Sequence, residues 1–136
     1  MKSTPWVALL LSIPASAVAQ YGLYDQPYSI IETDASRSAD HKLRPVTVNR
    51  VDGKNAQYGN RAIIEPGRHD VTVDLVARQN FHLPTQITFQ LETRPCTRYY
   101  VVARLDTVTG QRWEPVVRAE EPIGECIKKF DVAGAK

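Results

Sequence analysis

Residues 98–120 decide the fold, and they read RYYVVARLDTVTGQRWEPVVRAE. Polar and apolar side chains alternate with a period of two on both sides of Val108-Thr109-Gly110, which suits a three-residue hairpin loop with Gly in the left-handed position. In the register that this loop sets, Thr107 faces Gln111 and Arg104 faces Glu114. A slip by one residue would turn apolar side chains toward the polar face, so this register is strongly specified.

The two faces of this predicted hairpin differ in character. The polar face carries three pairs of opposite charge and one cation–π contact, namely Asp106 with Arg112, Arg104 with Glu114, Arg98 with Glu120, and Tyr100 with Arg118. The apolar face collects Tyr99, Val101, Ala103 and Leu105 on one strand and Trp113, Pro115, Val117 and Ala119 on the other. We expect the apolar face to join the core, and Pro115 indicates an edge strand or a bulge.

A third strand is expected to complete a C-terminal antiparallel meander. Pairing Glu92 with Arg98 sets 85–92 beside 98–106 with matching apolar faces. Cys96 then lies in the connecting loop, and Cys126 follows the end of the 111–119 strand closely enough to reach it. The sequence therefore predicts a Cys96–Cys126 disulfide, which closes a loop of about 30 residues and contributes roughly 3–4 kcal/mol in the chain-entropy model. A metal or redox pair is the alternative, but the spacing is not C-x-x-C.

The remaining chain shows the same two-residue period. Strands are expected at 46–51, 61–65, 69–77, 85–92, 98–106, 111–119 and 124–131, and no segment has a convincing helical period. We therefore predict an all-β domain over 46–136, a two-sheet immunoglobulin-like β-sandwich, with a small β-barrel as the alternative. Residues 20–45 contain three tyrosines within 21–28 and are expected to form a tethered arm that packs over the sheet edge, with a candidate short strand at 29–33.

The first nineteen residues have the pattern of a secretory signal peptide. Lys2 supplies a positive start, 6–13 form an apolar run, and Ala17-Val18-Ala19 fits the small-x-small cleavage motif, so we expect cleavage before Gln20. The apolar run is shorter than the roughly 20 residues that span a bilayer, and no second apolar stretch approaches that length. The mature chain is expected in the periplasm or outside the cell, where disulfides persist.

Two turn motifs and their flanking strands resemble a known family. The chain runs from Val46-Thr47-Val48 through the Asp52-Gly53 turn to Pro66-Gly67, which leads into Val71-Thr72-Val73. This stretch, about residues 46–76, resembles the PEGA-type surface-layer domain, although it lacks the Gly-x-x-Pro stretch that usually separates the two turns. The resemblance implies a small β-sandwich module of the cell envelope without catalytic residues.

Composition and motifs exclude several kinds of function. The 17 Lys and Arg nearly balance the 15 Asp and Glu, whereas duplex binding needs a concentrated basic face, so nucleic acid is not the expected partner. No serine lies in a Gly-x-Ser-x-Gly elbow. His41, His69 and His82 lie in separate segments without metal-ligand spacing, so no metal or cofactor is expected. An enzyme would need a cleft in which His69 or His82 meets a carboxylate.

The polar face of the hairpin is the candidate binding surface. Its candidate residues are Arg98, Tyr100, Arg104, Arg112 and Arg118, because Arg and Tyr are enriched at interface hot spots. We predict a non-catalytic binding or structural module that recognises an envelope protein or an anionic glycan through a sheet face or, by strand addition, a sheet edge. A secreted hydrolase inhibitor presenting the Thr93 to Thr97 loop is the alternative, and a small hydrolase follows it. A solvated face stabilised by its own cross-strand pairs is the other interpretation of these residues.

Overall fold

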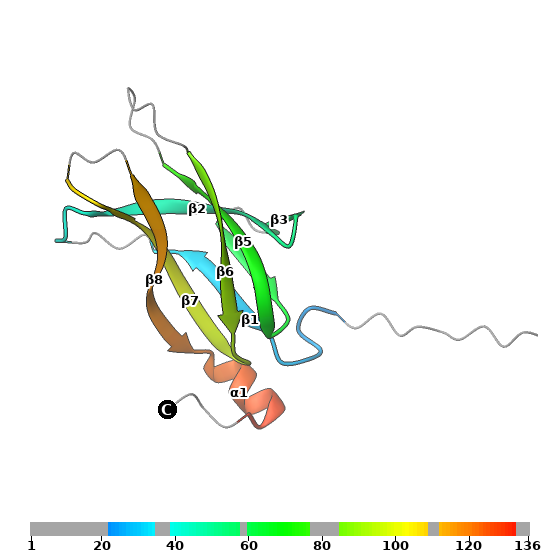
Figure 1. Ribbon diagram of the computed structural model, residues 1–136. Helices are drawn as coiled ribbons and strands as arrows, with labels where there is room; N and C mark the ends of the chain where they lie inside the picture. Colours follow the sequence, from blue (N-terminus) through cyan, green and yellow to red (C-terminus); the bar gives the residue numbers. More distant parts are fainter. Residues whose placement is uncertain (1–21, 35–38, 58–59, 77–84, 109–111, 133–136) are drawn as a thin grey trace, which may run out of the picture.

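The computed structural model describes residues 22–34, 39–57, 60–76, 85–108 and 112–132. The predicted signal peptide, His82 and the Thr109-Gly110 part of the hairpin loop lie outside these residues. Figure 1 shows the elements in chain order. They are β1 (Ser29–Thr33), β2 (Leu43–Val51), β3 (Lys54–Asn55), β4 (Arg61–Ile64), β5 (Gly67–Leu75), β6 (Gln86–Thr93), β7 (Thr97–Leu105), β8 (Trp113–Pro122) and α1 (Gly124–Phe130).

One strand joins the two halves of the sheet. The hydrogen-bonded order is β4–β1–β7–β2–β5–β6, with β8 paired to β7 and β3 paired to β2. Residues 43–45 of β2 pair with β7, and residues 46–51 pair with β5, so β2 passes from one half to the other. Figure 1 shows β2 crossing between the β7–β8 pair and the β5–β6 pair. The described strands therefore form one continuous sheet with two layers.

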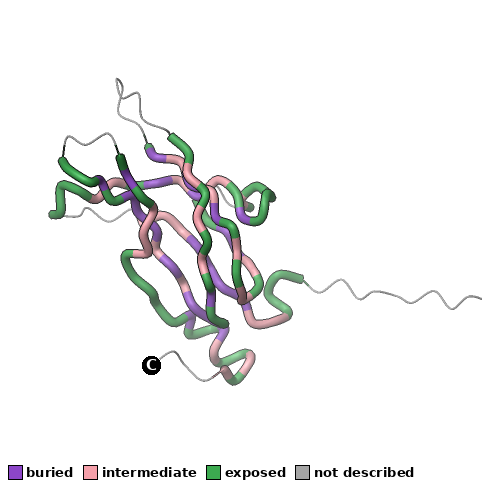
Figure 2. The backbone as a smooth tube through the Cα atoms, in the orientation of Figure 1, coloured by how far each residue is buried: buried purple, intermediate pink, exposed green. Residues whose placement is uncertain are grey.

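The two layers enclose a common core. Five valines at the centre of the core are completely buried, namely Val46 and Val48 of β2, Val71 and Val73 of β5, and Val101 of β7. They alternate with more exposed neighbours, as the two-residue period predicts. Ile31, Val51, Ala62, Leu75, Ala103, Leu105 and Trp113 complete this cluster. Figure 2 shows that the buried residues are concentrated along these strands. The prediction of an all-β fold is confirmed, with one continuous mixed sheet of eight described strands in place of the two separate sheets of an immunoglobulin-like sandwich.

The predicted disulfide is also confirmed, but the segment that carries Cys126 is helical. Cys96 and Cys126 are bonded with their Cα atoms 5.3 Å apart. The expectation of a strand at 124–131 is wrong, because α1 occupies Gly124–Phe130. One face of this segment is apolar and packs with a second cluster formed by Tyr28, Ile30 and Ile63. Its residues are Ile123, Cys126, Ile127 and Phe130, in which Cys126 and Ile127 each follow Ile123 and precede Phe130 by three or four positions. This helical spacing was the signal in the sequence, and it extends over less than two turns.

The third strand of the predicted meander lies elsewhere. β6 pairs with β5 and not with β7, so Glu92 faces Arg68 where Arg98 was predicted. The place beside β7 is occupied by β1, which runs parallel to β7 with Ile31 opposite Tyr99. The chain leaves β6 through a turn in which Cys96 has a φ of 53° and donates its N–H to the Tyr28 carbonyl. This turn carries the chain across to the other layer.

The position of β1 also corrects the expectation of a peripheral arm over 20–45. β1 lies between β4 and β7, and Ile31 is fully buried. The short strand expected at Ser29–Thr33 is present, but its placement in an arm over the sheet edge is wrong. β1 is an inner strand whose Ser29 hydroxyl donates to the Arg94 carbonyl at 2.7 Å.

The register of the β7–β8 hairpin is confirmed over its first half and wrong over its second. The predicted pairs hold from Leu105–Trp113 to Val101–Val117. Arg118 then forms a bulge, so that Tyr100 faces Ala119 and Arg98 faces Glu121. The predicted pairs Tyr100–Arg118 and Arg98–Glu120 are therefore wrong. Beyond the bulge Ala119 is exposed, although it was predicted on the core face.

Candidate functional site

The five predicted binding residues lie on β7, on β8 and just before β8, and those next to the hairpin loop are paired with carboxylates. Arg104 binds Glu114 with its Nε 3.0 Å from Oε1. The Nε of Arg112 lies 3.5 Å from Oδ2 of Asp106. Both contacts agree with the predicted cross-strand pairs, and they neutralise two of the five candidates.

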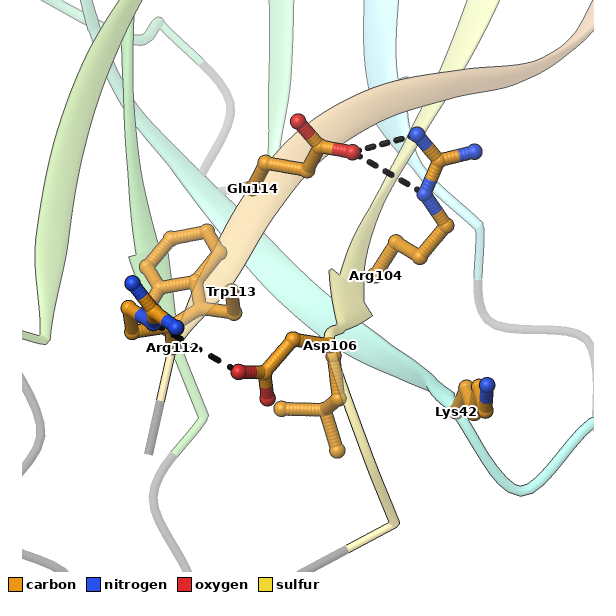
Figure 3. Close-up of a pocket in the computed structure, with 7 residues that line it drawn as sticks. Lys42, Arg104, Asp106, Arg112, Trp113 and Glu114 are labelled. Carbon is orange, nitrogen blue, oxygen red and sulfur yellow. Dashed lines mark hydrogen bonds and ion pairs between the residues drawn. The ribbon is translucent and has the colours of Figure 1, made fainter. Parts of the chain in front are cut away.

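These two ion pairs flank a shallow groove of about 440 Å³ (Figure 3). Its lining consists of Lys42, Arg104, Leu105, Asp106, Arg112, Trp113 and Glu114. Figure 3 shows the dashed contacts from Arg104 to Glu114 and from Arg112 to Asp106 on either side of Trp113. Trp113 is only 7% exposed and belongs to the core, so its ring presents little surface on which a sugar can stack. The groove combines three cations with two carboxylates and offers an anionic glycan only a weak field.

The other candidates join a second set of paired charges at the far end of the hairpin. Arg98 lies 3.8 Å from Glu32 of β1, which also binds Arg61 of β4 at 3.0 Å. Contact with the Tyr100 hydroxyl and the nearby Glu32 carboxylate raises the pKa of Arg98. Tyr100 in turn donates to Glu121 at 3.0 Å. The charges of this part of the surface are thus paired, although the buried Nε of Arg98 has no hydrogen-bond partner within the described part of the chain.

Arg118 finds a partner that cross-strand reasoning missed. Its Nη1 lies 2.6 Å from Oδ2 of Asp34, just after β1. With Tyr100 and Glu121 they line a recess of about 400 Å³. The geometry therefore fits the interpretation of the polar face as a solvated surface stabilised by its own pairs, each of which contributes at most about 1 kcal/mol.

One histidine does meet a carboxylate, next to a groove of about 290 Å³. The Nδ1 of His69 lies 2.7 Å from Oδ2 of Asp52, and its Nε2 lies 2.7 Å from the Glu65 carbonyl oxygen. Both neighbours are acceptor atoms, so the ring bridges a side chain and a backbone carbonyl. Hydrogen bonds from His69 and from the Asp70 backbone lower the pKa of Asp52. The ring thus ties the Asp52-Gly53 turn to the turn before β5.

This arrangement is suited to holding turns in place rather than to catalysis. The Glu65 carbonyl occupies the nitrogen that a general base would use, and the described lining of the groove contains no Ser, Thr or Cys. No group of three His, Cys, Asp or Glu side chains in the described part of the chain could hold a metal ion. Within the same residues, no helix has the length and apolar character to cross a bilayer. The sequence signal for the pair was weak, since Asp52 precedes His69 by 17 residues.

The loop proposed for an inhibitor is largely buried. Thr93, Cys96 and Thr97 are each at most 4% exposed, which leaves Arg94 and Pro95 at the surface. Arg94 is itself paired with Glu120. An inhibitory loop has to present an extended run of side chains to an enzyme cleft, and two exposed residues do not supply one.

The edge of β6, like the edges of β4 and β8, has no further strand partner among the described residues. The Leu75 N–H donates to the Thr85 carbonyl at 2.6 Å, which sets the phase of the antiparallel β5–β6 ladder. In such a ladder alternate residues point their N–H and C=O groups away from the neighbour. Those residues are Gln86, Thr88, Gln90 and Glu92. β6 thus presents an unprotected row of donors and acceptors over eight residues.

Comparisons with known proteins find no relative. No family model matches the chain, and no curated protein or solved structure is significantly similar to it. Inference about function therefore rests on the chain's own surfaces.

Proposed function

We propose that this chain is an exported, non-catalytic module that binds an extended protein segment by strand addition to β6. The observation that carries the proposal is the edge of β6, which has no proline, no bulge in its pairing with β5 and a single charged side chain, Glu92. Main-chain hydrogen bonds would supply affinity, and the half-buried Ile87, Phe89 and Leu91 would supply apolar contact on the core side.

Strand addition is favoured over glycan recognition because of the charges. The arginines of the polar face already bind Asp34, Glu32, Asp106 and Glu114. An anionic ligand would have to displace these carboxylates, and the displacement would offset most of the attraction gained. The backbone groups of the β6 edge have no such competitor among the described strands.

Two features support export and an envelope role. The first nineteen residues have the signal-peptide pattern, and a disulfide is typical of oxidising compartments. The resemblance of residues 46–76 to PEGA-type domains is in keeping with an envelope module.

The test is affinity capture with the mature chain tagged at Lys136, using a cross-linked envelope extract. Gln90→Pro removes an outward N–H from β6 but leaves the β5–β6 hydrogen bonds intact, and Gln90→Ala is the matched control. We expect one protein to be retained by the wild type and by Gln90→Ala, and to be lost with Gln90→Pro. Equal retention by all three chains would overturn strand addition. Capture of nothing but wall material would overturn recognition of a foreign protein.

A further inference from the structure

We infer that the strand added to β6 is β6 of a second copy of this chain, in antiparallel register about a twofold axis at Phe89. The inference rests on the proposed strand addition and names its partner. It follows from three properties of β6 that agree with one another: the direction of its backbone groups, the alternation of its side chains, and the placement of its one charge.

The backbone groups match in this register. With Phe89 opposite Phe89 of the second copy, Thr88 falls opposite Gln90 and Gln86 falls opposite Glu92. All four of these residues direct their N–H and C=O groups away from β5, as the Leu75–Thr85 hydrogen bond requires. Each pair can therefore exchange two hydrogen bonds without disturbing the ladder inside either copy.

The side chains match as well. Ile87, Phe89 and Leu91 are half-buried against the core, and the polar residues between them are exposed. The twofold register sets Ile87 opposite Leu91 and Phe89 opposite itself, so the apolar face continues across the two copies. A slip by one residue would set Phe89 against Thr88 or Gln90 and would also point paired backbone groups in the wrong direction.

The charges do not oppose the pairing. Glu92 is the one charged side chain of β6, and its Oε2 lies 3.3 Å from the Nε of Arg68 on β5. In the twofold register Glu92 faces the amide of Gln86, so no like charges lie opposite each other. The pairing also closes on itself, because each copy uses its β6 edge once, and it produces a dimer rather than a fibre.

The experiment is sedimentation equilibrium of the oxidised mature chain, from micromolar to near-millimolar concentration. We expect the wild type and Gln90→Ala to form a dimer, and we expect the dimer of Gln90→Pro to dissociate at least about tenfold more readily. Near-ultraviolet circular dichroism confirms that each variant is folded. A wild type that stays monomeric throughout this range would overturn the inference.

A cross-link tests the register independently of the proline. Chains with Thr88→Cys are mixed with chains with Gln90→Cys and oxidised mildly. In the proposed register these positions face each other as a hydrogen-bonded pair, about 5.5 Å apart between Cα atoms, which a disulfide can span. We expect a mixed disulfide dimer, with far less cross-linking in either chain alone. A dimer that resists Gln90→Pro and forms no mixed disulfide has its interface elsewhere, which overturns the inference.

The two proposals fail in different ways. A monomeric wild type that still retains a foreign protein in a Gln90-dependent manner contradicts the dimer and leaves strand addition standing. A monomeric wild type that retains nothing contradicts both.

Discussion

β6 and β8 are the two longest edge strands of the described sheet, with eight and ten residues, and they differ in how they are protected. On β8, the Asp106 N–H donates to the Arg112 carbonyl, so the backbone of Pro115 points away from β7. Proline therefore removes a donor from the exposed edge without costing a ladder bond. The bulge at Arg118, two successive glutamates and Pro122 further disrupt that edge.

β6 carries none of these features, although both strands belong to the same small domain. Edge protection is the usual way to prevent unwanted pairing, and its presence on one strand shows that this chain uses it. The protected edge of β8 and the open edge of β6 are therefore distinct, and this difference is why we propose strand addition at β6. Four predictions test the difference between the two edges.

The largest effect is expected for Phe89→Pro. Phe89 points its N–H toward β5, so proline removes a ladder bond and the aromatic contact with the core. We expect a loss of at least about 5 kcal/mol in the free energy of unfolding, measured by urea denaturation. The neighbouring Gln90→Pro should lose about 1 kcal/mol. Equal losses at the two positions would contradict the hydrogen-bond phase assigned to β6.

Removal of the disulfide by Cys96→Ser with Cys126→Ser should come next. The bridge ties α1 to the turn that carries the chain from β6 to β7. We expect a loss of roughly 3–4 kcal/mol from the closed loop of about 30 residues. The wild type is measured in its oxidised and reduced forms, and the free energy of unfolding of the reduced form should match that of the double variant. A variant as stable as the oxidised wild type would show that the bridge contributes little.

Pro115→Val restores the missing donor on the edge of β8 and should make it resemble β6. We expect less than about 1 kcal/mol of change in stability, because no ladder bond is involved, but more self-association at high concentration, measured by light scattering. Val116→Ala is the control, since it changes the same strand without adding an edge donor. If association is unchanged, the bulge and charges alone protect β8.

The smallest effect is expected for Asp52→Asn, which removes the charge of the carboxylate that binds His69 of β5. The lowered pKa of Asp52 means that its contribution to stability is present above about pH 3.8 and is lost as the pH falls below that value. Because the carboxylate is half exposed, we expect well under about 1 kcal/mol at neutral pH. The variant and the wild type should converge in stability in acid. A difference that grows in acid would contradict this sign.

The sequence predicted which residues of a strand point into the core better than it predicted which strands lie side by side. Alternation in β6 and β7 identified the residues that point inward, and the charge pairs set the first half of the β7–β8 register correctly. Alternation cannot tell which strand lies alongside, because Phe89 packs equally well beside a valine of β5 or of β7. β6 was therefore assigned to the wrong layer, and β1 was left outside the core.

The candidate site was predictable as a set of residues but not as a set of contacts. Arg104–Glu114 and Asp106–Arg112 followed from local pairing across one hairpin. Arg118 was misassigned because its partner, Asp34, is 84 residues away in sequence. The His69–Asp52 pair was missed for a similar reason, since it joins two turns on different strands.

The parallel pairing of β1 with β7 has a consequence for the order of events in folding. Ile31 cannot reach its place opposite Tyr99 until most of the chain is available, because the two positions lie far apart in sequence. Pairings of this kind close late and slowly. The core side of β1 therefore stays open until β7 arrives, whereas the β7–β8 pairing, which ends at Thr97–Pro122 next to Cys96, needs only local chain. During folding, the β1 segment is therefore expected to stay accessible after the local β5–β6 and β7–β8 pairs have formed.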